Sequence, residues 1–147
     1  MVVKGKLIFS MEVKCGGYSF HDIFHNKTHH IPKMSPSTFH HFEIHEGEII
    51  KIGSIVGWKY IQDGKEMFLK EVVDAIDRDQ SVFSRKVIEG NMLDLYSSFT
   101  LVTSYEHHWT TLALVYEKKT EDTPEPITFL SLLINMAKDM EGHLLNQ

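Results

Sequence analysis

Apolar and polar residues alternate along the start of the chain and again through most of its middle. From Lys6 to Lys14, Leu7, Phe9 and Met11 fall on one side of an extended backbone, which predicts a strand with one buried face. Turn signals such as Asp63-Gly64 separate later segments with the same period of two. These segments predict six further strands over residues 39–45, 54–61, 65–76, 81–88, 93–103 and 109–118. The pattern indicates a seven-stranded antiparallel meander.

Two segments carry the spacing of helices instead. Between Tyr18 and His25, apolar residues recur at helical intervals, and the prolines at 32 and 36 end any helix soon afterwards, so one or two short helices are expected. After Pro124-Glu125-Pro126, residues 127–145 predict a long amphipathic helix. We therefore expect an α+β domain over residues 1–147, with the sheet curved around the final helix because nothing else covers its apolar face.

Composition narrows the classes of function. The 147 residues carry a formal charge of −5 and no cluster of Lys and Arg, so nucleic acid is not an expected partner. No apolar run is long enough for membrane insertion, and the amino terminus lacks the pattern of a signal peptide. Cys15 is the one cysteine, which excludes an internal disulfide and suits a cytoplasmic location.

Several short motifs, in this order and spacing, identify a family. They are Trp58-Lys59-Tyr60, Asp63-Gly64-Lys65, Lys70-Glu71-Val72-Val73, Val87-Ile88-Glu89-Gly90 and Tyr116-Glu117-Lys118 followed by Pro124-Glu125-Pro126. With them the chain resembles the major latex proteins, a plant branch of the birch-pollen-allergen (Bet v I type, START-like) superfamily. The resemblance implies a helix-grip fold, in which two short helices follow the first strand and a seven-stranded sheet wraps around the carboxy-terminal helix.

The resemblance also implies a function. Such proteins hold small hydrophobic molecules of steroid, phenolic or alkaloid type in an internal cavity, and are pathogenesis-related proteins of plant defence or stress response. We expect a small hydrophobic ligand as partner, no cofactor, and a monomer or weak homodimer. Fold alone does not fix chemistry, because one fold hosts several activities.

Successive side chains of a strand point to opposite faces, so we can propose which residues form the wall of the predicted cavity. Taking Trp58 and Tyr60 as inward, the strands and helices contribute a mainly apolar set. It comprises Phe20, Ile23, Val56, Trp58, Tyr60, Phe68, Lys70, Phe83, Arg85, Val87, Phe99, Leu101, Leu112, Leu114, Tyr116, Phe129, Leu133, Met136 and Met140. All the apolar members could equally pack a solid core. The two cations favour a hollow, because an unpaired charge in a solid core is costly.

Arg85 departs from the pattern of the family, which usually places an aromatic or apolar residue there. An inward guanidinium could clamp a carboxylate or phenolate of the ligand. A bulge or register shift would instead put Arg85 on the surface. The sequence leaves both possibilities open.

Catalysis is the alternative to carriage. Lys70, Tyr60, Tyr116 and His108 are the types of residue that acid/base isomerisation, cyclisation or condensation without a cofactor would need, so Lys70, Tyr60 and His108 are the candidate catalytic residues. His21 and His25 have the i, i+4 spacing of zinc ligands, but the glutamate of a HExxH site is absent, and we expect no metal.

Overall fold

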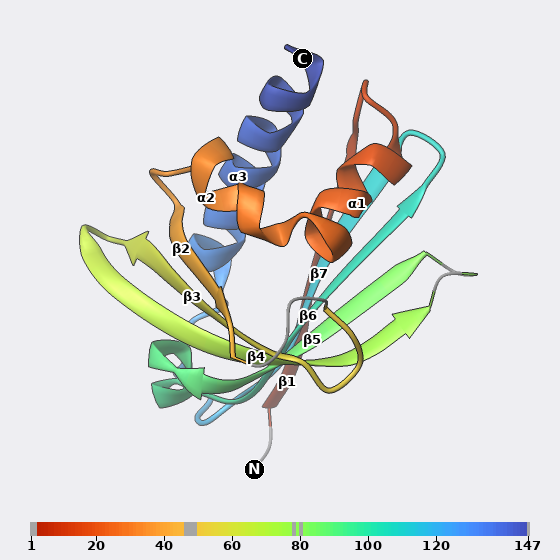
Figure 1. The fold of residues 1–147 in the computed structure, drawn as a ribbon. Coiled ribbons are helices and arrows are strands. Elements are labelled where there is room, and N and C mark those ends of the chain that lie inside the picture. Colours follow the sequence, from red (N-terminus) through yellow and green to blue (C-terminus); the bar gives the residue numbers. More distant parts are fainter. Residues whose placement is uncertain (1–2, 46–49, 78, 80, 147) are drawn as a thin grey trace.

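The structure is a computed structural model that describes residues 3–45, 50–77, 79 and 81–146. Its helices are α1 (Gly17–Asn26), α2 (Ile31–Met34) and α3 (Ile127–Leu145), with short 3₁₀ turns η1 (Thr28–His30) and η2 (Asn91–Asp94). Its strands are β1 (Val3–Glu12), β2 (Phe39–Ile44), β3 (Ile55–Gln62), β4 (Lys65–Asp77), β5 (Val82–Gly90), β6 (Tyr96–Glu106) and β7 (Trp109–Lys118). They form one curved antiparallel sheet in the order β1-β7-β6-β5-β4-β3-β2 (Figure 1). The predicted fold class is confirmed.

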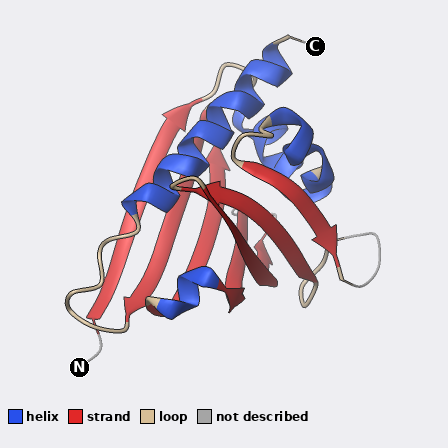
Figure 2. Cartoon of the chain, turned by 90° about the vertical axis from the view of Figure 1, so that its left-hand side faces the viewer, coloured by secondary structure: helices blue, strands red, loops and turns tan. Residues whose placement is uncertain are grey.

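The long helix α3 crosses the concave face of the sheet (Figure 2). It buries one stripe, made by Phe129, Leu133, Met136, Ala137 and Met140. These positions recur every three to four residues, so they share a face of the helix, which packs onto the apolar side of the strands. The core of the molecule therefore lies between the sheet and α3.

Both ends of α3 are fastened to the rest of the chain. Near its start, Glu125 accepts hydrogen bonds from the Tyr116 hydroxyl and the Lys118 ammonium of β7. Towards its end, the Ser35 hydroxyl, just after α2, donates to Asp139 Oδ2 at 2.6 Å. The short helices α1 and α2, which follow the first strand as the family resemblance implies, both contact α3 as well.

The β3–β4 hairpin sets the register of the central strands. Its turn is the two residues Asp63 and Gly64, whose φ angles of 53° and 76° are those of a tight hairpin turn. Gln62 therefore pairs with Lys65, and Trp58 pairs with Leu69. Further along β4, the pairing with β5 shifts by one residue between Lys70 and Glu71, which is a β-bulge.

Strand ends differ from the sequence prediction at a few places. The segment predicted to begin a strand at Leu93 forms η2, and β6 begins at Tyr96 and continues to Glu106. The Asn91 side chain accepts a hydrogen bond from the Phe68 amide at 2.9 Å, so it satisfies a β4 donor that a continued strand would have paired. In the sheet β4 pairs with β5 and not with β6, so this bond stands where a longer β5 would have paired. It explains why β5 ends at Gly90 and the chain turns through η2 before β6 begins.

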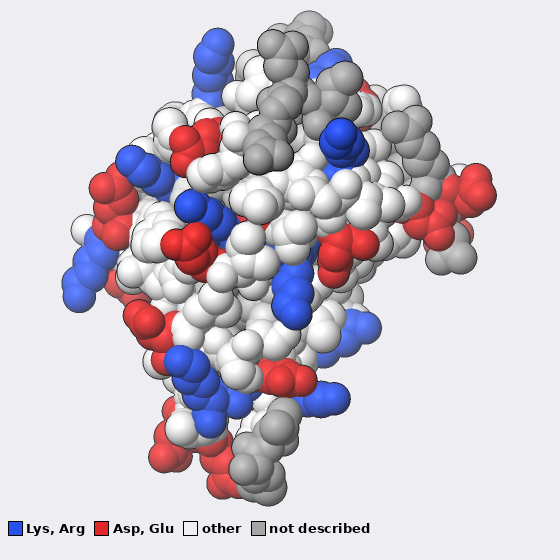
Figure 3. Space-filling model, turned by 60° about the horizontal axis from the view of Figure 1, so that its bottom comes forward, with Lys and Arg blue, Asp and Glu red and all other residues white. Residues whose placement is uncertain are grey.

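Charges on the outside are mixed. Acidic and basic side chains are interspersed over the face shown in Figure 3, in keeping with the modest formal charge of −5. Within the described ranges, no helix has the combination of length and apolarity that crossing a bilayer requires.

Candidate functional site

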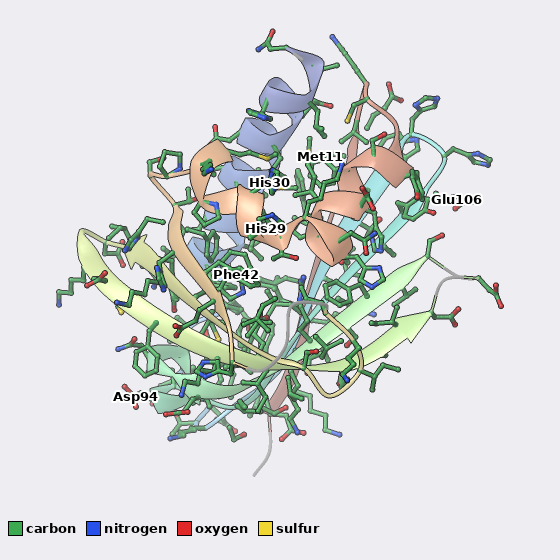
Figure 4. All side chains as sticks on the ribbon, viewed as in Figure 1. Met11, His29, His30, Phe42, Asp94 and Glu106 are labelled. Carbon is green, nitrogen blue, oxygen red and sulfur yellow. The ribbon has the colours of Figure 1, made fainter. Side chains whose placement is uncertain are left out.

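A narrow space lies inside the molecule, between the concave face of the sheet and α3. Side chains from both layers crowd this region in Figure 4, and the volume left for water-sized groups is about 20 Å³. A single water needs about 10–15 Å³ on this measure, so the predicted roomy cavity is nearly closed in this structure. We call it the interior space. Its lining is Phe24, Ile31, Phe39, Trp58, Leu69, Glu71, Arg85, Leu101, Phe129, Leu133 and Met136.

A second, larger space opens where α3 begins. It holds about 170 Å³, and we call it the entrance groove. Its lining is Tyr60, Gln62, Met67, Asn91, Met92, Leu95, Tyr96, Phe99, Pro124, Glu125, Pro126, Thr128 and Phe129. The groove therefore combines the β3–β4 hairpin, η2 and the segment before α3.

Phe129 lines both the interior space and the entrance groove. Its ring packs edge-on against Tyr60 at 5.5 Å, Phe99 at 5.7 Å and Phe39 at 6.2 Å between centroids. Edge-to-face contacts at these distances are favourable, so the four rings form a partition between the two spaces.

Most of the predicted wall residues are buried, and the structure divides them into two groups. Those that line the interior space, the entrance groove or a smaller void beside Arg85 are Trp58, Tyr60, Arg85, Phe99, Leu101, Leu112, Leu114, Phe129, Leu133 and Met136. The others, buried outside the lining of these three spaces, are Phe20, Ile23, Val56, Phe83, Val87, Tyr116 and Met140. The second group packs the core.

Three predicted positions were wrong. Phe68 is 44% exposed, and Lys70 pairs with Glu89 at 3.3 Å on the outer face, so neither lies on the concave side. The reason is the register, because Trp58 and Tyr60 point inward opposite Leu69 and Met67. His108, the third, lies exposed in the turn between β6 and β7.

The prediction also missed residues that the interior space needs. Leu69 and Glu71 occupy the inward positions of β4, while Ile31 and Phe39 come from α2 and the first residue of β2. The signal for β4 was present in the sequence. A two-residue Asp-Gly turn after Gln62 pairs even-numbered residues of β3 with odd-numbered residues of β4, which assigns Leu69 and Glu71 to the face of Trp58.

Glu71 and Arg85 form a buried ion pair in the wall of the interior space. Arg85 Nε lies 3.7 Å from Glu71 Oε2, and the relative exposures of the two residues are 6% and 2%. The other carboxylate oxygen of Glu71 accepts a hydrogen bond of 2.9 Å from Trp58 Nε1. The Arg85 guanidinium also lies 4.7 Å from the centre of the Phe83 ring and 5.7 Å from that of Phe24, which are cation–π distances. The structure thus places Arg85 inside.

Burial shapes the electrostatics of this region. Desolvation raises the pKa of Glu71, opposed by the charge of Arg85 and the Trp58 hydrogen bond. Burial lowers the pKa of Arg85, opposed by Glu71 and Asp74. Burial, with His25 and Arg85 nearby, lowers the pKa of His21 from 6.5 to about 4.

The proposed acid/base residues are not brought together. Tyr60 stays inside, where desolvation raises its pKa to about 12, and its ring packs on Phe39 and Phe129. The Tyr116 hydroxyl is occupied by Glu125. Because Lys70 and His108 lie outside, the structure offers no shared site for these four groups. Among the described residues, no group of three or more His, Cys, Asp or Glu side chains is arranged to hold a metal ion.

Comparison with known proteins agrees with this architecture. The sequence profile of the pathogenesis-related protein Bet v 1 family matches residues 2–147. MLP-like protein 43 of Arabidopsis thaliana is 36% identical over 147 residues, covering 96% of this chain and 93% of that protein. The crystal structure of ginseng major latex-like protein 151 from Panax ginseng superposes with a TM-score of 0.91 at 34% identity, over 97% of this chain and 98% of that one.

A more distant structure shares the fold. Norcoclaurine synthase from Thalictrum flavum, in complex with dopamine and hydroxybenzaldehyde, superposes with a TM-score of 0.79 over 99% of this chain and 89% of that one. The sequence identity is 19%, so this likeness concerns the fold alone.

Proposed function

The chain belongs to the pathogenesis-related protein Bet v 1 family, and from that premise we propose that it binds and carries small apolar molecules. The observation that carries the proposal is the interior space between the sheet and α3, whose lining is apolar except for Glu71 and Arg85. Ligand pockets of this kind combine an apolar wall with a few placed polar groups.

Size determines how such a molecule enters. A volume of about 20 Å³ cannot hold a ligand larger than about one water, so binding requires the side chains to move. Phe129 separates this volume from the entrance groove, and Met136 on the same face of α3 is an unbranched, adaptable side chain. We expect the ligand to pass the groove, displace the Phe129 ring and lie against Leu101 and Leu133.

The proposed setting is a plant cytoplasm, in defence or stress response, with the protein acting as a monomer or weak homodimer. Support for the compartment is the lone Cys15, which cannot form an internal disulfide. The chemistry of turnover is not part of this proposal, because the acid/base residues lie apart.

A fluorescence titration tests carriage directly. The neutral probe N-phenyl-1-naphthylamine should bind to the wild-type protein, with stronger emission on entering an apolar site. Leu133→Trp should weaken binding at least about tenfold, because the indole fills the interior space that Leu133 lines. Asn135→Trp adds the same side chain on the exposed face of α3 and should leave the affinity unchanged.

A second variant tests the partition. Phe129→Ala should tighten probe binding several-fold and admit bulkier probes, because it joins the entrance groove to the interior space. Equal affinities for wild type, Leu133→Trp and Phe129→Ala would place the probe on the surface and refute carriage in the interior.

A further inference from the structure

Two buried polar atoms face each other across the wall of the interior space without hydrogen bonding. Among the described residues, Arg85 Nε and Glu71 Oε2 have no hydrogen-bond partner, and the 3.7 Å between them is beyond hydrogen-bond range. Both side chains are more than nine-tenths buried. Leaving buried charged groups unsatisfied is costly, so this arrangement is suited to a third group that bridges the two atoms from one side.

The chemistry of the two atoms restricts that third group. Arg85 Nε carries a hydrogen and can only donate, whereas an ionised carboxylate oxygen of Glu71 can only accept. One group that satisfies both must accept from Arg85 and donate to Glu71 at the same time. A hydroxyl has both capacities on one oxygen, and two hydrogen bonds of about 2.8 Å can meet at one oxygen across a gap of this width.

The charges of the pair indicate the charge of the ligand. Arg85 and Glu71 carry opposite formal charges, and the rest of the lining is apolar. An anionic ligand would place a second negative charge beside Glu71 and lose its own hydration, which is unfavourable in a low-dielectric interior. Asp74 adds to the negative field at Arg85, and the His21 ring also lies close enough to Arg85 for the guanidinium charge to lower its pKa.

Building on the proposed function, we propose that the Glu71–Arg85 pair selects neutral apolar ligands that carry a hydroxyl, either an alcohol or a phenol. The hydroxyl sits to one side of the pair and bridges Arg85 Nε and Glu71 Oε2 by two hydrogen bonds, and the apolar body of the ligand lies against Leu101, Phe129 and Leu133. The space beside the pair already accommodates a group about the size of one water, so the hydroxyl can bind there without a shift of the backbone.

Three ligands of one shape test this selection in the wild-type protein. We would measure how 2-naphthol, 2-methylnaphthalene and 2-naphthoate displace N-phenyl-1-naphthylamine at neutral pH. 2-Naphthol should bind about tenfold more tightly than 2-methylnaphthalene, because hydrogen bonds to charged groups outweigh the dehydration of the hydroxyl. 2-Naphthoate should bind more weakly than 2-naphthol.

An apolar variant should reverse the order of the first two ligands. Trp58→Phe/Glu71→Leu/Arg85→Met removes the polar side-chain groups from the lining of the interior space, and buried ion pairs replaced by apolar residues commonly leave a folded protein. In this variant 2-methylnaphthalene should bind more tightly than 2-naphthol, because burying an unpaired hydroxyl is unfavourable. As a matched control, Lys70→Gln/Glu89→Gln removes the outer pair of the same two strands and should keep the wild-type order.

The outcomes separate the two proposals. If the wild type binds the probe but does not prefer 2-naphthol, or if the apolar variant keeps the preference, selection by the pair is refuted while carriage stands. If 2-naphthoate binds most tightly to the wild type, Arg85 acts as an anion site and selection of a neutral hydroxyl is wrong. If neither the wild type nor the control binds the probe or any of the ligands, carriage and selection both fail. The wild-type series decides the matter even if the triple variant does not fold.

Discussion

Two ion pairs join β4 to β5, and they occupy opposite faces of the sheet. Lys70 and Glu89 lie 3.3 Å apart with side-chain exposures of 33% and 59%, whereas Glu71 and Arg85 lie 3.7 Å apart with exposures of 3% and 7%. The outer pair is surrounded by solvent, which screens its attraction and hydrates each charge. The inner pair has lost its hydration and depends on its own members and on Trp58.

Adjacent residues of one strand therefore have opposite energetic roles. Either member of the outer pair can be removed with little effect, because water replaces the partner. Removal of one member of the inner pair leaves a buried charge alone. Four predictions test this difference.

The largest effect is expected for Arg85→Met. It leaves the Glu71 carboxylate buried and unpaired, and should lower the free energy of unfolding by about 3–5 kcal/mol, measured by urea denaturation at neutral pH. Burial raises the pKa of Glu71, so as the pH falls the native state takes up a proton on Glu71 before the unfolded state does, and the loss should shrink. The variant Glu71→Gln/Arg85→Met should recover most of the stability. A loss below about 1 kcal/mol in the single variant would show that the inner pair behaves like the outer one.

Trp58→Phe should have the next largest effect. It removes the hydrogen bond to Glu71 Oε1 and should cost about 2 kcal/mol of unfolding free energy, typical of a hydrogen bond to a charged group. The cycle formed with Glu71→Gln isolates this contribution. If Trp58→Phe lowers the unfolding free energy equally with Gln and with Glu at position 71, the hydrogen bond gains no extra stability from the charge of the carboxylate.

A smaller effect concerns His21, the histidine beside Arg85. Its pKa of about 4 in the folded protein is below the ordinary 6.5. As the pH falls, the unfolded state therefore protonates His21 before the folded state does. Stability should therefore fall as the pH drops from about 6.5 towards 4, and His21 should account for roughly 1–2 kcal/mol of that loss after allowance for solvent screening.

His21→Phe is the variant that measures this contribution, by thermal denaturation across the pH range. It should flatten the acid limb of the stability profile relative to wild type, whereas the same substitution at the exposed His29 should not. An acid limb unchanged in His21→Phe would mean that other groups cause it.

The smallest effect is expected for Lys70→Gln. Loss of the outer pair should change the unfolding free energy by less than about 1 kcal/mol, and the difference should disappear at high salt. Urea denaturation at low and high ionic strength measures both quantities. A loss as large as that of Arg85→Met, insensitive to salt, would remove the contrast between the two faces.

Periodicity in the sequence was sufficient to predict the architecture. The strands and α3 bury one face each, so apolar residues repeat every two or every three to four positions, and the predicted 127–145 helix matches α3 residue for residue. The start of β6 was missed because residues 91–94 form the turn η2, in which the Asn91 side chain satisfies the Phe68 amide in place of a longer β5.

The site was harder to predict, and β4 shows why. Apolar residues occupy both faces of this strand, with Phe68 and Val72 on one side and Leu69 and Val73 on the other, so alternation does not say which side is buried. The two-residue turn before β4 resolves the question through register. The bulge after Lys70, which brings Arg85 and Glu71 to the same side, has no comparable signal in the sequence.

The attachment of α3 at both ends restricts how the protein can open. Hydrogen bonds to Glu125 hold the start of α3 against β7, and the bond from Ser35 to Asp139 holds its second half against the segment after α2. Because α3 is held at both of these points, it does not move away from the sheet as a hinged lid would. A ligand must therefore enter by reorienting aromatic and methionine side chains beneath α3, which favours slender, flat molecules over bulky ones.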